Sequence, residues 1–279
     1  MSNKILVLGG TGKTGRRIAE RLIQRGLPVR IGSRNANPSF DWENSSNWID
    51  VLQQIDTIYI SFQPDLAVPG SVDKISAFVD AARRSGVKKL VLLSGRGEQE
   101  TQHCENIVMQ SQLDWSIVRA SWFMQNFSEG FLAEAILSGH LVLPIIKAKE
   151  PFIDVDDIAD VVTKIIADES HSNTLIELTG PELLSFEKIA QLISAAINRP
   201  IVFEEVATQQ YTEMLRTYEI PDDFIALIKY LFTELMDGRN ESLTNEVENI
   251  LGRKAGSLES YISKVVDAGS WQSKELVAS

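Results

Sequence analysis

Short hydrophobic runs alternate with amphipathic segments along the first half of the chain. The segments between the runs, such as 16–25 and 72–85, have the spacing of helices, and the runs themselves lie at 5–8, 29–31, 57–62, 89–93 and 114–118. Strands that are largely hydrophobic on both faces belong to parallel sheets that helices cover on both sides. The pattern therefore predicts an α/β fold with a doubly wound parallel sheet.

The second half reads as more helical. A helix is expected at 154–167, a strand at 175–178, and a helix at 189–197 for which Ser185 is the N-cap. Further helices after residue 208 are broken at Pro221, Gly238 and Gly252. We therefore expect residues 1–120 to form a nucleotide-binding domain that about 151–180 completes. A smaller, mostly helical C-terminal substrate lobe is expected from 121–150 and 181–279.

A glycine-rich turn follows the first predicted strand and opens a helix. It reads Gly9-Gly10-Thr11-Gly12-Lys13-Thr14-Gly15, with glycines three apart at 9, 12 and 15. In a Rossmann-type domain such glycines allow the tight turn, the approach of a pyrophosphate and close helix packing. The helix N-terminus then presents N–H groups to the phosphates. The turn predicts a dinucleotide site.

The sequence Gly12-Lys13-Thr14 is similar to the end of a P-loop. That motif requires a glycine five residues before the Gly-Lys pair, where this chain has Val7. The turn is also too short to wrap a β-phosphate, which argues against an NTPase or kinase.

The end of the second predicted strand bears on which cofactor binds. An NAD site places an Asp or Glu there for the ribose 2′-hydroxyl. This chain has Ser33 and Arg34 instead, and Arg16 follows the last glycine of the turn. These side chains can bind a 2′-phosphate, and one charge-assisted hydrogen bond is worth about 1.5–3 kcal/mol. NADP(H) is therefore expected in preference to NAD(H).

Composition excludes several classes of partner. The net charge is −11 and the pI is about 4.9, which disfavours sequence-independent binding of nucleic acid and docking on anionic lipid. The single cysteine, Cys104, allows no internal disulfide. No hydrophobic run reaches the length of a membrane span or of a signal-peptide core, so a soluble, cytoplasmic protein is expected. No metal site is predicted, and the oligomeric state is not indicated.

Several motifs together resemble the NmrA-like, atypical short-chain dehydrogenase/reductase family. They are Leu6–Gly12, Gly86–Val91, Ser116–Asn126 and Phe152–Val161. The opening Gly-Gly-Thr-Gly-Lys-Thr and the later Ile-Gly-Ser-Arg look most like the subgroup of ergot-alkaloid festuclavine and agroclavine dehydrogenases and its bacterial relatives. The resemblance implies an NAD(P)-binding Rossmann fold with a small substrate lobe, and an oxidoreductase.

The resemblance also implies roles for residues that match the family's motifs. Thr11, Lys13 and Thr14 would line the phosphate loop. Ser61, Phe62 and Gln63 would end a fourth strand near the nicotinamide ribose, and Ser94 and Gly95 would end a fifth strand under the nicotinamide. Trp122 and Phe123 would lie beside the ring, although Arg119-Ala120 stands where the family commonly has Arg-Pro.

The usual acid of short-chain dehydrogenases is missing. Those enzymes use Tyr-x-x-x-Lys, in which the tyrosine protonates the developing alkoxide. The stretch from Gly95 to Glu105 contains neither Tyr nor Lys, and none of the five tyrosines precedes a lysine by four residues. Ser94 and His103 are weak candidates for catalysis. Glu98, Gln125 and Asn126 are further candidates for the substrate pocket, and Glu98 can hold a cationic substrate.

Two functions fit these observations. In the first, the protein is an NAD(P)H-dependent reductase that transfers hydride to a small acceptor such as an iminium ion or another conjugated electrophile, without the Tyr-x-x-x-Lys acid. In the second, it is an NADP(H)-binding redox sensor of the NmrA type that acts on a protein partner. The first is preferred because aromatic residues of the C-terminal lobe can line a pocket for a small substrate.

Overall fold

The computed structural model describes residues 4–272. The chain forms two compact units. The first contains Met1–Ala120, Val155–Leu178 and Asn245–Lys254, and the second contains Ser121–Asp154, Thr179–Thr244 and Ala255–Ser279. Each is described below by itself.

A six-stranded sheet forms the centre of the first unit, and all of its neighbouring strands are parallel. The strand order is β2-β1-β3-β4-β5-β7. The strands are β1 (Ile5–Leu8), β2 (Val29–Gly32), β3 (Thr57–Ile60), β4 (Lys89–Gly95), β5 (Asp114–Ala120) and β7 (Thr174–Leu178). This topology confirms the predicted doubly wound, Rossmann-type sheet.

The strand numbers taken from the family resemblance were wrong by one. Thr57–Ile60 is the third strand of the chain and Lys89–Gly95 the fourth. Between β2 and β3, residues 33–56 form a loop, the 3₁₀ turn Ser45–Asn47 and the short helix α2 (Trp48–Leu52), with no strand. The two strands are neighbours in the sheet, and β3 also pairs with β1. The residues that follow them therefore still lie at the edge of the sheet where the glycine turn lies.

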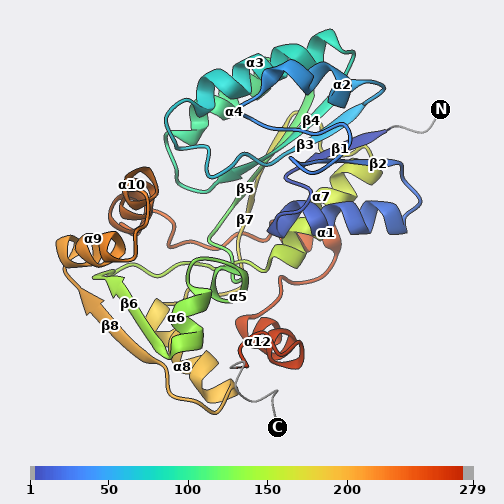
Figure 1. The fold of residues 1–279 in the computed structure, drawn as a ribbon. Helices are drawn as coiled ribbons and strands as arrows, with labels where there is room; N and C mark the ends of the chain where they lie inside the picture. The colour runs from blue at the N-terminus through green and yellow to red at the C-terminus, as the bar shows by residue number, and fades with distance from the viewer. Residues whose placement is uncertain (1–3, 273–279) are drawn as a thin grey trace. The chain divides into compact units, whose positions relative to one another are not determined.

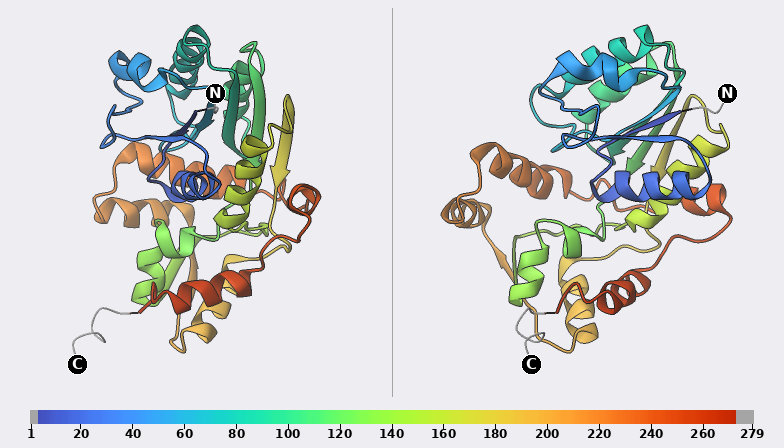
Figure 2. Two further views of the ribbon diagram at one scale, coloured as in Figure 1. Left: turned by 90° about the vertical axis from the view of Figure 1, so that its right-hand side faces the viewer. Right: turned by 45° about the vertical axis from the view of Figure 1, so that its right-hand side comes forward.

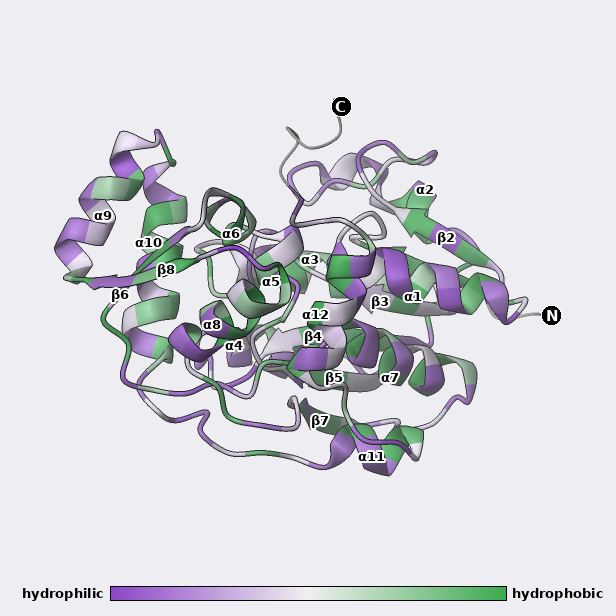
Figure 3. Ribbon diagram, turned by 90° about the horizontal axis from the view of Figure 1, so that it is seen from below, coloured by the Kyte–Doolittle hydropathy of each residue, from purple (hydrophilic) through white to green (hydrophobic). Residues whose placement is uncertain are grey.

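Helices cover both faces of this sheet (Figures 1 and 2). Helices α1 (Lys13–Gln24) and α7 (Val155–Ala167) lie side by side on one face, and α2, α3 (Ser71–Arg84) and α4 (Thr101–Met109) lie on the other. Figure 3 shows hydrophobic and hydrophilic residues alternating along α1, as expected for a helix with one buried face. The longest helix among residues 4–272 has 14 residues, and none there is long and apolar enough to cross a membrane.

Alternate strand residues form the core beneath α2, α3 and α4. Leu6, Ile58 and Leu90 are fully buried there, and Phe78 of α3 and Val108 of α4 pack in the same cluster. Because strand side chains alternate between faces, the residues between them are buried on the opposite face, as Val7 and Val91 are. Burial on both faces explains the nearly continuous hydrophobic runs of the sequence.

One short helix belongs to a different unit from the one predicted. Helix α11 (Glu246–Leu251) contacts α7 and β7 and is part of the first unit, whereas the sequence placed it in the C-terminal lobe. Val247 and Ile250 are its buried residues, and Gly252, at φ +70°, ends it. A six-residue helix carries too few hydrophobic positions to reveal which core it joins.

The second unit is mostly helical but contains a small sheet that the sequence did not predict. Strands β6 (His140–Pro144) and β8 (Val202–Val206) form a parallel pair. The helices are α5 (Asn126–Glu129), α6 (Ala133–Ser138), α8 (Phe186–Ala196), α9 (Thr208–Thr217), α10 (Asp222–Tyr230), the π-helical segment Leu231–Leu235, and α12 (Leu258–Asp267). The predicted N-cap of α8 is confirmed, since Ser185 Oγ accepts a hydrogen bond from Lys188 N at 3.2 Å.

Candidate functional site

The glycine turn joins β1 to the N-terminus of α1. Gly9 has φ +64°, a conformation that favours glycine, and Gly12 N donates to Gly9 O at 2.8 Å. Helix α1 begins at Lys13 with Gly12 as its N-cap, no side chain caps it, and its first turn contains no acidic residue. Its N-terminal N–H groups therefore favour an anionic ligand.

Close packing explains why this turn needs glycines. A Cβ atom on Gly15 would lie 2.3 Å from the backbone oxygen of Gly9, and one on Gly10 would lie 2.8 Å from Ile31 Cγ2. The first clash involves backbone that no rotamer change can move. The sequence analysis did not include Gly10 among the site residues, because it lies outside the three-residue spacing.

Two side chains of the turn differ in how accessible they are. Thr11 is exposed, whereas Thr14 is 4% exposed and accepts a hydrogen bond from Tyr59 Oη at 2.9 Å. The Thr14 side chain thus points toward the sheet, which leaves its backbone N–H to face a phosphate. Lys13 is half-buried. The Tyr59 hydroxyl is fully buried and donates to Thr14, so this tyrosine does not replace the missing acid.

The end of β2 lies beside the turn. Leu8 pairs with Gly32, and Gly10 N donates to Gly32 O at 3.4 Å. The next two residues, Ser33 and Arg34, therefore follow the strand at the edge of the turn, and the Arg34 side chain is exposed. Arg16 lies half-buried in the first turn of α1.

The end of β3 also meets the glycine turn. The Cβ position of Gly9 is 3.3 Å from Ser61 Cβ, and that of Gly12 is 3.6 Å from Gln63 Nε2. The structure thus brings both predicted residues to the turn. Phe62 between them is 7% exposed and packs against Trp42, with ring centroids 4.8 Å apart, so only its backbone can face a ligand.

The end of β4 carries a buried polar network. Ser94 Oγ donates to Glu105 Oε1 at 2.6 Å, and Arg119 donates to the same carboxylate through Nε at 2.8 Å and Nη2 at 2.6 Å. Glu105 is fully buried and its hydrogen bond raises the pKa of Arg119. Glu177 of β7 accepts from Arg119 at 3.2 Å. Ser94, a candidate for catalysis, thus directs its hydroxyl into this network.

Glu98 lies in the loop after β4, and its carboxyl group is buried. The side chain is 6% exposed and lies near Asp65, in the loop after β3, whose charge acts on it. Burial, and next the negative charge of Asp65, raise the pKa of Glu98 well above its ordinary value. The expectation that Glu98 belongs either to a solvated loop or to the wall of a cation site did not include this pairing.

His103 and Cys104 are consecutive residues of α4 whose side chains differ in exposure. His103 is exposed, whereas Cys104 is fully buried, and burial raises the pKa of its thiol. The structure therefore does not bring the two side chains together as a Cys–His pair. His103 remains a candidate acid on the basis of sequence alone.

Four candidate pocket residues lie at the start of the second unit. Trp122 is 9% exposed and packs edge-on against Phe186, with centroids 5.7 Å apart, while Phe123 is half-buried. Gln125 is buried and its Nε2 donates to Asp154 Oδ1 at 2.7 Å, and Asn126, which begins α5, is half-buried. The two buried side chains are thus held by neighbours of their own unit.

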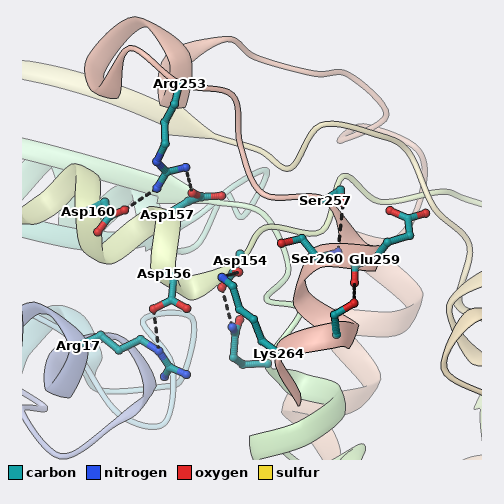
Figure 4. A network of polar contacts seen from close by, with 12 residues as sticks. Arg17, Asp154, Asp156, Asp157, Asp160, Arg253, Ser257, Glu259, Ser260 and Lys264 are labelled. Carbon is teal, nitrogen blue, oxygen red and sulfur yellow. Dashed lines mark hydrogen bonds and ion pairs between the residues drawn. The ribbon is translucent and has the colours of Figure 1, made fainter. Parts of the chain in front are cut away.

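The acidic residues at the start of α7 form ion pairs (Figure 4). Asp156 pairs with Arg17 at 3.3 Å, Asp157 pairs with Arg253 at 2.6 Å, and Asp154, which precedes the helix, pairs with Lys264 at 3.2 Å. Asp156 and Asp157 lie in the first turn, where the sequence analysis placed capping residues. Within residues 4–272 no group of three His, Cys, Asp or Glu side chains is arranged to hold a metal ion.

Comparison with known proteins agrees with this sheet and turn. The chain matches the NmrA-like family over residues 1–265, and it belongs to that family. It is similar to the uncharacterized oxidoreductase YesF of Bacillus subtilis, with 29% identity over 97% of both chains. It is also similar to festuclavine synthase II of Penicillium roqueforti, with 30% identity over 89% of this chain and 93% of the other.

A solved structure shows the same fold. The NADPH-dependent quinone oxidoreductase of Escherichia coli, in complex with NADPH, superposes with a TM-score of 0.79 over 94% of this chain and 99% of the other, at 16% identity. The resemblance to the NmrA-like family and to the festuclavine and agroclavine dehydrogenases, made on sequence motifs, is thereby confirmed.

Proposed function

We propose that this protein is an NADP(H)-dependent reductase that transfers hydride to a small conjugated acceptor. The observation that carries the proposal is the uncapped N-terminus of α1, packed through Gly15 against Gly9 at the carboxyl edge of the sheet. In open parallel sheets, ligands bind at this edge. The Gly9 backbone already occupies the space that a Cβ on Gly15 would fill. Helix α1 can therefore pack this closely on the turn only with glycine at position 15.

Each part of this edge has a role toward the cofactor. The N–H groups of Lys13, Thr14 and Gly15 would hold the pyrophosphate, with Thr11 and Gly12 lining the turn. Ser33, Arg34 and Arg16 would bind the 2′-phosphate. Ser61 and Gln63, with the backbone of Phe62, would approach the nicotinamide ribose, and Ser94 and Gly95 would support the ring. The bound cofactor supplies a hydride, and the protein supplies orientation and electrostatics.

The acceptor class follows from the chemistry and the relatives. An iminium ion takes a hydride and becomes a neutral amine, so it needs no acid. Relatives named festuclavine synthase and agroclavine dehydrogenase support a reductase rather than a sensor. Glu98, Trp122, Phe123, Gln125 and Asn126 remain the candidate substrate-pocket residues, and a small-molecule substrate is the expected partner.

A screen for NADPH oxidation tests the reductase. The acceptors are a cyclic iminium ion, an enone, a quinone and a cationic dye, each measured against an acceptor-free blank. The proposal predicts turnover of at least one acceptor. Tight NADPH binding without any turnover, together with a strong preference for one redox state of the cofactor, would instead support the redox sensor. The absence of the Tyr-x-x-x-Lys pair also favours that alternative.

Replacing Arg34 by Ala tests the preference for NADP(H). The exposed guanidinium lies just beyond β2, where the chain carries no acid, so its loss removes one charge-assisted hydrogen bond to the 2′-phosphate. The Kd for NADPH is expected to rise about tenfold, corresponding to about 1.4 kcal/mol, while the Kd for NADH stays the same.

The matched control for this variant is Arg25→Ala. Arg25 is also exposed but lies at the opposite end of α1. Replacing it therefore removes the same charge at a distance from the turn. It should leave both affinities unchanged in calorimetric titrations at constant salt. Equal weakening of NADPH and NADH by Arg34→Ala would assign Arg34 to the common phosphates or to general charge.

A further inference from the structure

The loops that follow β3 and β4 bring two carboxyl groups together. Asp65 and Glu98 are 33 residues apart in the sequence, yet β3 and β4 are paired neighbours, so their carboxyl ends meet at one edge of the sheet. Asp65 lies close enough that its negative charge acts on Glu98 more strongly than any other charge does. Adjacent carboxylates repel each other, which favours a state in which one of the pair carries a proton.

The proton belongs on Glu98. Asp65 is half-exposed, and its Oδ1 accepts a hydrogen bond from Ala67 N at 2.8 Å, which stabilises its charge. Glu98 is 6% exposed, and its Oε2 is buried with no N–H or O–H donor within residues 4–272. Burial without a donor disfavours the charged form of a carboxyl group. Glu98 is therefore the acid of the pair and Asp65 the carboxylate.

The other groups around Glu98 act in the same direction. Glu100, which precedes α4, and Glu105 within α4 add negative charge, and Cys104 of the same helix is neutral. Glu105 is balanced by Arg119. Of these, Asp65 has the largest influence on the pKa of Glu98 after burial itself. Glu98 is therefore expected to keep its proton to a higher pH than an ordinary glutamate, as in other carboxyl pairs that share one proton.

Glu98 is held against the residue that ends β4. A Cβ on Gly95 would lie 1.9 Å from Glu98 Oε1, so the missing side chain of Gly95 makes room for this carboxyl group. Thr101 Oγ1 donates to the backbone oxygen of Glu98 at 2.9 Å and fixes the turn. Gly95 is also the residue expected under the nicotinamide. The acid thus lies at the edge of the sheet where hydride transfer is proposed.

We propose that Glu98 donates the proton that completes reduction of a conjugated carbonyl acceptor, and that Asp65 returns a proton to it from solvent. This inference rests on the proposed reductase. For an enone, hydride adds to the β-carbon, and the C=C electron pair moves to leave an enolate oxygen. That oxygen takes the Glu98 proton and gives an enol, which tautomerises to the saturated ketone. The two adjacent carboxylates that remain repel each other, and the half-exposed Asp65 lets one proton return.

Acceptors differ in whether they need a proton after they take a hydride. Enones and quinones gain negative charge when they accept hydride, so they depend on Glu98. An iminium ion ends neutral and does not. The pair therefore supplies the function of the missing tyrosine.

Glu98→Gln separates the two classes of acceptor. Glutamine has the shape of protonated glutamic acid but cannot release a proton. The kcat for an enone is expected to fall about a hundredfold or more, while the kcat for an iminium ion stays within about twofold. Glu20→Gln is the matched control, because it removes an exposed carboxylate from α1, on the opposite face of the sheet from α4, and it should leave both values near those of the wild type.

The pH dependence distinguishes a proton donor from a structural residue. Because the acid must be protonated, kcat for the enone should be constant below the pKa of Glu98 and fall as the pH rises through it, and because that pKa is raised, the fall should come at a higher pH than for an ordinary glutamate. The iminium reaction should lack this fall. Asp65→Asn removes the neighbouring charge, so the fall should move to lower pH.

A measurement without turnover completes the test. In the wild-type protein, the ¹³C resonance of the Glu98 carboxyl group, assigned by its loss in Glu98→Gln, should titrate well above the ordinary glutamate pKa of about 4.3. Titration at the ordinary value, or an enone kcat unchanged in Glu98→Gln, would overturn the proton donor and leave the reductase intact. No turnover of any acceptor by the wild type would overturn the reductase itself.

Discussion

Replacing Arg119 by Met is expected to lower the free energy of unfolding by about 3–5 kcal/mol. Glu105 is fully buried, and Arg119 donates two hydrogen bonds to it, at 2.8 and 2.6 Å. Without the guanidinium, the buried carboxylate keeps, among residues 4–272, the hydrogen bond from the Ser94 hydroxyl, which cannot balance its charge. Denaturant unfolding measured by circular dichroism gives this difference directly.

A second substitution shows that the loss comes from the unpaired charge. The double variant Arg119→Met/Glu105→Leu removes both charges and should recover a substantial part of the stability, because apolar replacements for a buried ion pair are often tolerated. Arg83→Met, which breaks an exposed pair with Asp80, should cost less than about 1 kcal/mol. If the stability losses of the Arg119→Met and Glu105→Leu single variants simply added in the double variant, the unpaired charge would not explain the loss.

Gly15→Ala is expected to raise the Kd for NADPH on the order of a hundredfold, or about 2.7 kcal/mol. Helix propensity alone would make alanine favourable here by about 1 kcal/mol, since Gly15 lies within α1. The new Cβ, however, would meet Gly9 O at 2.3 Å, so the turn must open and its N–H groups must move. Calorimetric titration with NADPH measures the change.

Gly26→Ala is the control for a general loss of stability. Gly26 follows α1 with φ +74°, and nothing lies within 4 Å of a Cβ placed there. Alanine at this position strains the backbone but leaves the glycine turn unchanged, so stability should fall while NADPH affinity stays the same. If both variants weakened NADPH equally, the role assigned to the turn would be wrong.

Local patterns predicted the first unit well, because the residues that define its nucleotide turn are close together in the sequence. The strand, the three spaced glycines and the start of the helix occupy eleven consecutive residues from Ile5 to Gly15, so one short segment carries the signal. The parallel sheet follows from hydrophobic runs whose residues are buried on both faces. Ser61 and Gln63 were placed through the family resemblance, and β3 ends just before them, at Ile60.

Strands β6 and β8 could not be predicted in the same way. Their pairing partners are 62 residues apart, and β8 is interrupted by Glu204 and Glu205, while the hydrophobic run of β6, Leu141–Leu143, ends at Pro144. Such short strands become stable only through pairing and through the core that Leu141 and Leu143 join. Pattern alone therefore favoured a helical lobe.

The pairing of Asp65 with Glu98 also depends on the fold. Each carboxylate, read separately, is typical of a solvated loop. What brings them together is the adjacency of β3 and β4, combined with the lack of a side chain at Gly95. The available signal was a polar residue after each of two neighbouring strands, and it becomes informative only once the strand order is known.

The central claim is that the N-terminal sheet edge binds NADP(H) in preference to NAD(H). Calorimetric titration of the wild-type protein with NADPH and with NADH, at the same salt concentration, tests it most directly. The account predicts that NADPH binds at least about tenfold more tightly. Binding of neither cofactor would contradict the proposed site, and equal binding of both would contradict the role assigned to Ser33 and Arg34.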